Sequence, residues 1–172
     1  MSKTLTEREL VFAFPDAWHP ETFDQEGATW PKHIMPVDFI VERPNDILLI
    51  EVKDPSISNA PDAERAKFAK KMQSHELTHE ELVPKARTTW SYLHLMARTG
   101  KPLRYLVAIG TERLSIQPVL LQSLTDRLRQ RLAQESDAPW KLEYVASCMV
   151  VSALDLGNYL DGVTVVRTPA GP

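Results

Sequence analysis

The stretch "PVDFIVERPNDILLIEVKD", residues 36–54, predicts two strands joined by a tight turn. Its two halves, "PVDFIVE" and "DILLIEVKD", are rich in aliphatic and β-branched residues, and the Pro-Asn centre of "RPND" suits a type I turn. Because Pro44 disfavours a two-residue primed turn, we expect a four-residue loop. The segment is therefore predicted to form a β-hairpin, around which the rest of the fold is arranged.

The register of this hairpin gathers charged side chains on one face. With a symmetric loop centred between Pro44 and Asn45, Asp38 lies directly opposite Glu51, with the two Cβ atoms about 5 Å apart. Lys53 lies on the same face, because side chains alternate along a strand. A loop of odd length would instead put Asp38 and Glu51 on opposite faces.

Asp38 and Glu51 would repel each other unless a cation lay between them. Hard oxygen ligands favour Mg²⁺ or Mn²⁺ over zinc, and such an ion polarises a phosphodiester and lowers the pKa of an attacking water. Lys53 would orient that water or stabilise the pentavalent phosphate. These three residues are the candidate active site of a metal-dependent phosphodiesterase. The alternative is an exposed strand end with an ordinary ion pair.

Helices and strands are predicted on both sides of the hairpin. Helices are expected at residues 62–73, roughly 79–98 and 118–134, and strands at 103–110, 142–151 and 163–167, the last closing the sheet. A short element near residues 7–14 fits either strand or helix. This order predicts an α/β fold with a mixed sheet flanked by helices, in a single domain covering residues 1–172.

The bulk composition limits the classes of function. With 172 residues, 43% hydrophobic and 25% charged, the chain is long enough to bury a core. Its net charge of -3 gives no overall attraction for nucleic acid, so such binding would need local basic patches. No apolar run approaches the roughly 20 residues of a membrane-spanning helix, and no apolar signal core is present, so we expect no membrane association and a cytoplasmic location.

A second motif, "HELTHE" at residues 75–80, proposes different chemistry. It matches His-Glu-x-x-His, so a zinc peptidase that uses His75, Glu76 and His79 is an alternative function. Against it, Thr78 and Glu81 form a capping box that predicts a helix start at 79, and a proline interrupts the helix soon afterwards. The two histidines are therefore expected to straddle a helix boundary, and no second motif supplies a third ligand.

The hairpin resembles a known family. "PVD", a twelve-residue gap and then "EVK" after a hydrophobic strand is similar to the PD-(D/E)XK phosphodiesterase superfamily, the fold of many restriction endonucleases and DNA-repair nucleases. The resemblance implies a restriction-endonuclease-like α-β-β-β-α-β core. It also implies an Mg²⁺ or Mn²⁺ ion held by Asp38, Glu51 and the backbone carbonyl of Val52, with Lys53 at the attacking water.

The same resemblance suggests further site residues. Many members carry an acidic metal ligand on the first helix, for which the candidates in this chain are Glu9, Glu7 and Asp24. Lys85 lies on the helix predicted after the core strands and would face the site, together with Thr89 and Tyr92 on the same helical face. The alternative for Lys85 is an ordinary surface lysine.

A nuclease of this kind would act on nucleic acid, DNA rather than RNA, and a homodimer would suit the cleavage of two strands. Basic side chains on two predicted helices are candidate phosphate contacts: Arg65, Lys67, Lys70, Lys71, Arg127, Arg129 and Arg131. Solvated helix faces have the same composition, so that alternative stays open. A further alternative is a non-catalytic member of the same fold that binds nucleic acid or protein without cleaving it.

Overall fold

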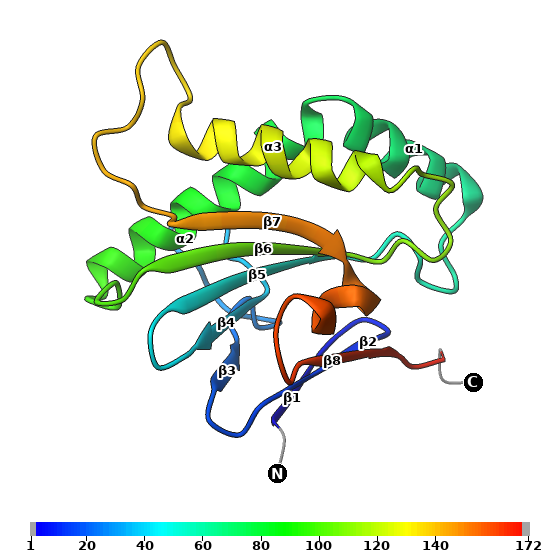
Figure 1. The fold of residues 1–172 in the computed structure, drawn as a ribbon, viewed down its shortest axis with the longest axis horizontal. Coiled ribbons are helices and arrows are strands. Elements are labelled where there is room, and N and C mark those ends of the chain that lie inside the picture. The colour runs from blue at the N-terminus through cyan, green and yellow to red at the C-terminus, as the bar shows by residue number, and fades with distance from the viewer. Residues whose placement is uncertain (1–2, 170–172) are drawn as a thin grey trace.

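The computed structural model describes residues 3–169 and contains two sheets with helices (Figure 1). The larger sheet has five strands in the order β3 (His19–Thr22), β4 (Phe39–Glu42), β5 (Ile47–Lys53), β6 (Leu103–Ile109) and β7 (Ser147–Ser152). The smaller sheet is antiparallel, in the order β1 (Lys3–Glu7), β2 (Leu10–Phe14) and β8 (Thr164–Arg167). The predicted mixed α/β fold is therefore confirmed.

Helices cover one face of the larger sheet, and the smaller sheet packs on the other (Figure 1). The helical layer consists of α1 (Asp62–Gln73), the π-helical η1 (Leu77–Leu82), α2 (Val83–Leu95) and α3 (Val119–Ala133). A 3₁₀ helix, η2 (Ala153–Asn158), connects β7 to the smaller sheet. Among residues 3–169, no helix is both long and apolar enough to cross a membrane.

The predicted hairpin is confirmed. β4 and β5 pair antiparallel with Phe39 opposite Ile50, and the four residues 43–46 form the turn. Continuing the same register by one pair puts Asp38, just before β4, across from Glu51. The even-numbered loop expected from the Pro-Asn centre thus holds both carboxyl groups on one side of the sheet.

Side chains of β5 alternate between two cores on opposite faces of the larger sheet. Leu49 packs in the core beneath the helices, whereas Leu48 and Ile50 pack in the core shared with the smaller sheet. By the same alternation, Glu51 and Lys53 point toward the helical layer. Because the side chains of β5 alternate between the two faces, both charged groups lie at the interface between the larger sheet and the helices.

The parallel strands bring their carboxyl ends to one edge of the larger sheet. β5 and β6 pair parallel, as do β6 and β7, and helices connect them in sequence. In open sheets of this kind, ligands bind outside the carboxyl ends of the strands. The motif "EVK" lies at the end of β5, and hence at this edge.

The ends of the chain depart from the expected core. Residues 7–14 contribute to strands β1 and β2, joined at Arg8 with φ 53°, so the described residues before β3 provide strands rather than a leading helix. From β3 to β6 the order is β-β-β, helices, β. The last strand, β8, pairs with β2, so the prediction that it closes the main sheet is wrong. The reason is η2, which turns the chain away from β7 into the other layer (Figure 1).

The second predicted helix begins before residue 79, so the predicted boundary is wrong. η1 starts at Leu77 and continues into α2 through Val83, which has helical dihedral angles (φ -66°, ψ -47°). Thr78 does not cap a helix, because its side chain is buried and its hydroxyl has no hydrogen-bond partner among the described residues. Pro84 lies at the junction of η1 and α2, where the helix passes from the π-helical to the α-helical form.

Candidate functional site

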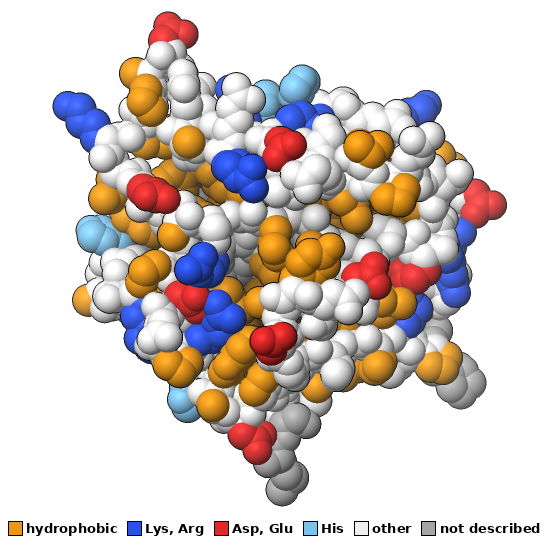
Figure 2. All heavy atoms as spheres, in the orientation of Figure 1, with side chains coloured by type: hydrophobic (Ala, Val, Ile, Leu, Met, Phe, Trp, Pro, Cys, Tyr) orange, Lys and Arg blue, Asp and Glu red, His pale blue; other side chains and the backbone are white. Residues whose placement is uncertain are grey.

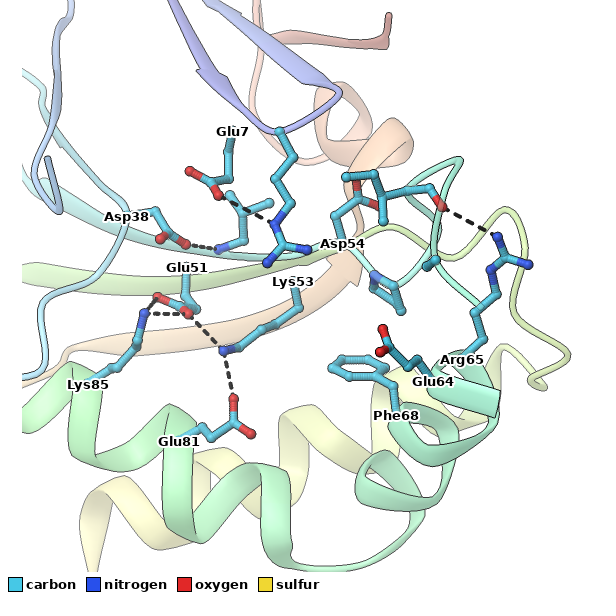
Figure 3. A pocket seen from close by; sticks show the side chains of 15 residues that line it. Glu7, Asp38, Glu51, Lys53, Asp54, Glu64, Arg65, Phe68, Glu81 and Lys85 are labelled. Carbon is cyan, nitrogen blue, oxygen red and sulfur yellow. Dashed lines mark hydrogen bonds and ion pairs between the residues drawn. The ribbon is translucent and has the colours of Figure 1, made fainter. Parts of the chain in front are cut away.

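A pocket of about 370 Å³ opens at the end of β5, between the β1–β2 turn and the helical layer (Figure 3). Three of the four residues predicted as catalytic come from the hairpin and the fourth comes from α2. The charged side chains that line the pocket are Glu7, Arg8, Asp38, Glu51, Lys53, Asp54, Glu64, Arg65, Glu81 and Lys85. The structure thus brings together carboxylates and ammonium groups from separate segments.

Glu51 is the buried centre of this pocket. Its side chain is 1% exposed, and the Nζ of Lys85 lies 2.8 Å from Oε1 and 2.9 Å from Oε2. The Nζ of Lys53 lies 3.2 Å from Oε1. Burial, and then the charge of Asp38, raise the pKa of Glu51 to about 7 against the attraction of both lysines. Glu51 is therefore near the midpoint of its titration at neutral pH.

Lys53 is held between two carboxylates. Its Nζ donates to Oε2 of Glu81 at 2.7 Å, and the other oxygen of Glu81 accepts from Lys71 at 2.9 Å. Burial lowers the pKa of Lys53, but the charges of Glu51 and Glu81 outweigh it and leave the pKa raised. Lys53 is thus an ammonium group, suited to donating to a phosphate rather than to accepting a proton.

Asp38 is oriented by the neighbouring strand. Its Oδ2 accepts the backbone N–H of Val52 at 2.6 Å. Because the N–H and C=O of one strand residue point to the same side, the carbonyl of Val52 faces that side as well. Asp38, Glu51 and the carbonyl of Val52, which the resemblance implies as metal ligands, thus lie on neighbouring segments of the hairpin.

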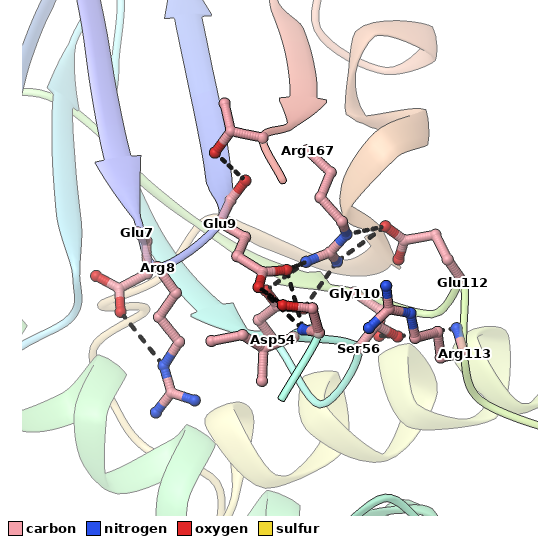
Figure 4. A network of polar contacts seen from close by, with 12 residues as sticks. Glu7, Arg8, Glu9, Asp54, Ser56, Gly110, Glu112, Arg113 and Arg167 are labelled. Carbon is pink, nitrogen blue, oxygen red and sulfur yellow. Dashed lines mark hydrogen bonds and ion pairs between the residues drawn. The ribbon is translucent and has the colours of Figure 1, made fainter. Parts of the chain in front are cut away.

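The structure brings Glu7 rather than Glu9 to the pocket. Burial, and then the charge of Asp38, raise the pKa of Glu7. The carboxylate of Glu9 instead accepts from the N–H and hydroxyl of Ser58 and from Arg167 (Figure 4). The two residues are separated because Glu7 ends β1, whereas Glu9 lies in the β1–β2 turn, after the positive φ of Arg8.

Asp24 contributes its backbone rather than its side chain to the site segment. Its N–H donates to the carbonyl of Asp38 at 3.3 Å, next to the 2.8 Å bond from the N–H of Phe23 to the same oxygen. The side chain of Asp24 does not line the pocket, although its charge adds to the forces that raise the pKa of Glu7. Asp24 is therefore a neighbour of the site that helps to fix the backbone before β4.

Lys85 reaches the site without its two predicted companions. Thr89 is fully buried, and its hydroxyl accepts the N–H of Val37 at 3.1 Å. Tyr92 packs edge-on against the ring of Trp30, with centroids 5.1 Å apart. Lys85 therefore faces the pocket, whereas the residues one and two turns later on the same face of α2 pack in the core. This packing fixes the helix, and α2 contributes one ammonium group, that of Lys85, to the pocket.

A partly buried arginine holds the side chain of Asp54, just beyond Lys53, and the sequence analysis missed it. Arg167 of β8 binds both oxygens of Asp54 at 2.8 Å, as well as Glu9 and Glu112 (Figure 4). Asp54 has no exposed side-chain surface. The only local signal was the acidic residue that follows "EVK", since its partner lies far away in sequence.

The donor set fits a hard divalent cation better than zinc. Among residues 3–169, no group of three or more His, Cys, Asp and Glu side chains is arranged to hold a metal ion. Mg²⁺ needs fewer protein ligands, because it keeps several waters and commonly binds through one or two carboxylates plus substrate phosphates. Asp38 and Glu51 supply two carboxylates, of which Glu51 is paired with the ammonium groups of Lys53 and Lys85.

The histidines of "HELTHE" lie apart from this pocket and straddle the start of a helix, as predicted: His75 precedes η1 and His79 lies within it. The N–H of His79 donates to the carbonyl of His75 at 2.9 Å, and their ring centroids are 5.2 Å apart. Glu76 pairs with Lys71 at 3.3 Å. Two arginines, not a third metal ligand, line the space beside the imidazoles.

Few of the predicted phosphate contacts reach the pocket. Arg65 lines it, with one guanidinium nitrogen 2.7 Å from Asp62. Lys71 is joined to it through Glu81. Arg127 instead donates to carbonyl groups at the end of α1. Local helical position therefore did not indicate which cations face the site.

Comparisons with protein-family models, curated proteins and solved structures found no match. The description of the pocket therefore depends on the side chains that line it. These are two facing carboxyl groups, one of them buried with a pKa of about 7, and two ammonium groups on either side of it. This combination can hold a hard cation and an anionic substrate in the same place.

Proposed function

We propose that this protein is a metal-dependent phosphodiesterase that cleaves nucleic acid, DNA in preference to RNA. The observation that carries the proposal is the buried Glu51 across from Asp38, with Lys53 beside it at the mouth of the pocket. Paired carboxyl groups next to a firmly charged ammonium group suit a reaction in which negative charge grows on a phosphate. We further propose that β3 to β6 and their helices correspond to most of a restriction-endonuclease-like core.

In this proposal Asp38, Glu51 and the carbonyl of Val52 would hold Mg²⁺ or Mn²⁺. The ion, when bound, would polarise the phosphodiester and lower the pKa of the attacking water. Lys53 donates to a non-bridging phosphate oxygen or to the water, and Glu81 fixes its direction. Lys85 neutralises Glu51 in the absence of other cations and is positioned to turn toward a substrate phosphate.

Cleavage assays test the proposal. Labelled single-stranded and duplex DNA, and RNA, would be incubated with Mg²⁺, Mn²⁺ or a chelator. We expect metal-dependent cleavage that falls by about 100-fold or more in Asp38→Asn and in Lys53→Met. Matched controls are Asp126→Asn on α3 and Lys101→Met, which pairs with Glu42 near the opposite end of β5. Full activity in Asp38→Asn would refute the assignment.

A duplex substrate also bears on assembly. One pocket of this kind cuts one strand at a time, so cleavage of both strands is expected to involve a homodimer. Light scattering of the protein with and without a duplex would measure the mass of the complex. Binding of DNA without cleavage, under every metal condition, would instead assign a non-catalytic binding role to the same pocket.

A further inference from the structure

A second pocket lies between η1 and α3, on the far side of η1 from Glu81. Every side chain around it carries nitrogen donors: His75, His79, Arg127, Gln130 and Arg131. No carboxylate is among them. Figure 2 shows histidine beside Lys or Arg side chains at the upper edge of the molecule, the side on which α3 lies in Figure 1. The motif that suggested zinc is therefore part of a cationic surface.

Arg127 lines one side of this pocket with a positive charge that is held in place. Its guanidinium donates at 2.6 Å to the carbonyl of Met72 and at 2.6 Å to that of Ser74. These bonds cap the end of α1 and hold Arg127 in place, so it contributes charge but few free donors. Donors for a ligand would come from His75 and His79 on one wall and from Gln130 on the other.

Arg131 is the free charge of the pocket. Among residues 3–169 its side chain takes part in no hydrogen bond or ion pair. Burial, and then Arg131, His75 and Arg127, lower the pKa of His79, whereas the charge of Glu80 raises it by less. This field repels a divalent cation and attracts an anion.

We propose that the pocket binds a phosphate-type oxyanion, either free phosphate or a phosphodiester group, with Arg131 as the charged donor and His75, His79 and Gln130 as hydrogen-bond donors. Guanidinium groups pair well with phosphate oxygens, and imidazole N–H groups add directed donors. The site is separate from the carboxylate pocket, since His79 and Glu81 leave η1 in different directions. The proposal of an anion site therefore does not depend on the proposed catalysis.

Titration with inorganic phosphate tests the proposal. Histidine ring resonances would be followed by NMR at constant ionic strength, with a chelator present and chloride as the reference anion. We expect saturable shifts of His75 and His79, and a higher pKa for His79 when phosphate is bound. Arg131→Gln should weaken phosphate binding about tenfold or more. The matched control Arg129→Gln, which removes an exposed arginine paired with Asp126, should leave it unchanged.

A short DNA duplex, titrated under the same conditions, identifies the source of the phosphate. Weaker duplex binding in Arg131→Gln, with a salt slope smaller by about one, would support the site and assign it to a nucleic-acid backbone. Phosphate binding without any effect of Arg131→Gln on duplex affinity would support a site for free phosphate. No saturable shift, equal losses in Arg131→Gln and Arg129→Gln, or saturable Zn²⁺ binding at the two histidines would overturn the proposal.

Discussion

Glu51→Gln should change the pH dependence of stability in a way that follows from burial. The folded pKa of Glu51 is about 7, against an ordinary value of 4.5. A raised pKa means that the folded state binds the proton more tightly than the unfolded chain does. The stability that this proton contributes is present in full below pH 4.5 and is lost as the pH rises through about 7.

The size of the effect follows from the two pKa values. One pKa unit corresponds to about 1.4 kcal/mol, so ionised Glu51 costs the folded state about 3 kcal/mol at alkaline pH. Glutamine keeps the shape of the protonated acid and cannot ionise. We therefore expect the stability of wild type, relative to Glu51→Gln, to fall by about 2–3 kcal/mol between about pH 5 and about pH 8.5.

Urea unfolding, followed by tryptophan fluorescence at both pH values, would measure this difference. Glu80→Gln, which removes an exposed carboxylate from η1, controls for the loss of one charge. A constant difference between wild type and Glu51→Gln at the two pH values would refute the reasoning that Asp38 and burial together disfavour the ionised form. Under the proposed function, Mn²⁺ at alkaline pH should stabilise wild type and not Glu51→Gln.

Three further predictions concern the groups that hold the site. Arg167→Ala leaves the buried carboxylate of Asp54 unpaired and should lower the free energy of unfolding by about 3–5 kcal/mol in urea. Gly110→Ala would place a Cβ 2.3 Å from Oδ1 of Asp54, so we expect a loss of about 2–4 kcal/mol in the same assay. Glu81→Gln should reduce cleavage about tenfold and move the alkaline limb of its pH profile to lower pH, because Glu81 raises the pKa of Lys53.

Each of these has a control within the chain. Gly100→Ala meets no atom within 4 Å of the added Cβ and should cost far less than Gly110→Ala. Arg129→Ala removes an exposed arginine and should change stability little. For Glu81→Gln, a lower rate with an unshifted pH profile would mean that Glu81 acts on folding rather than on Lys53.

The sequence by itself determined the local elements. The hairpin register depends on a turn of even length and a period of two, so Asp38, Glu51 and Lys53 could be placed on one face from 19 residues of sequence. The helix predicted at 62–73 has those bounds in the structure, and the helix predicted at 118–134 is one residue shorter at each end. These features are decided by backbone geometry and by contacts between residues close in sequence.

Only the tertiary structure decided how distant groups meet. The approach of Lys85 to Glu51, the choice of Glu7 over Glu9 and the clamp of Arg167 on Asp54 each join segments that the chain must fold to bring together. Tertiary contacts also overrode local signals.

The region around Thr78 is the clearest example. Its capping signal favoured a helix start, but burial of Thr78 and the bond from Lys53 to Glu81 accompany a continuous helix. Side chains that pack against a sheet gain more free energy than one cap supplies, since a cap contributes about 1 kcal/mol and a fully buried apolar side chain about 1.5–3 kcal/mol. Short-range patterns therefore fixed the carboxylate pair, and packing between layers determined which cations surround it.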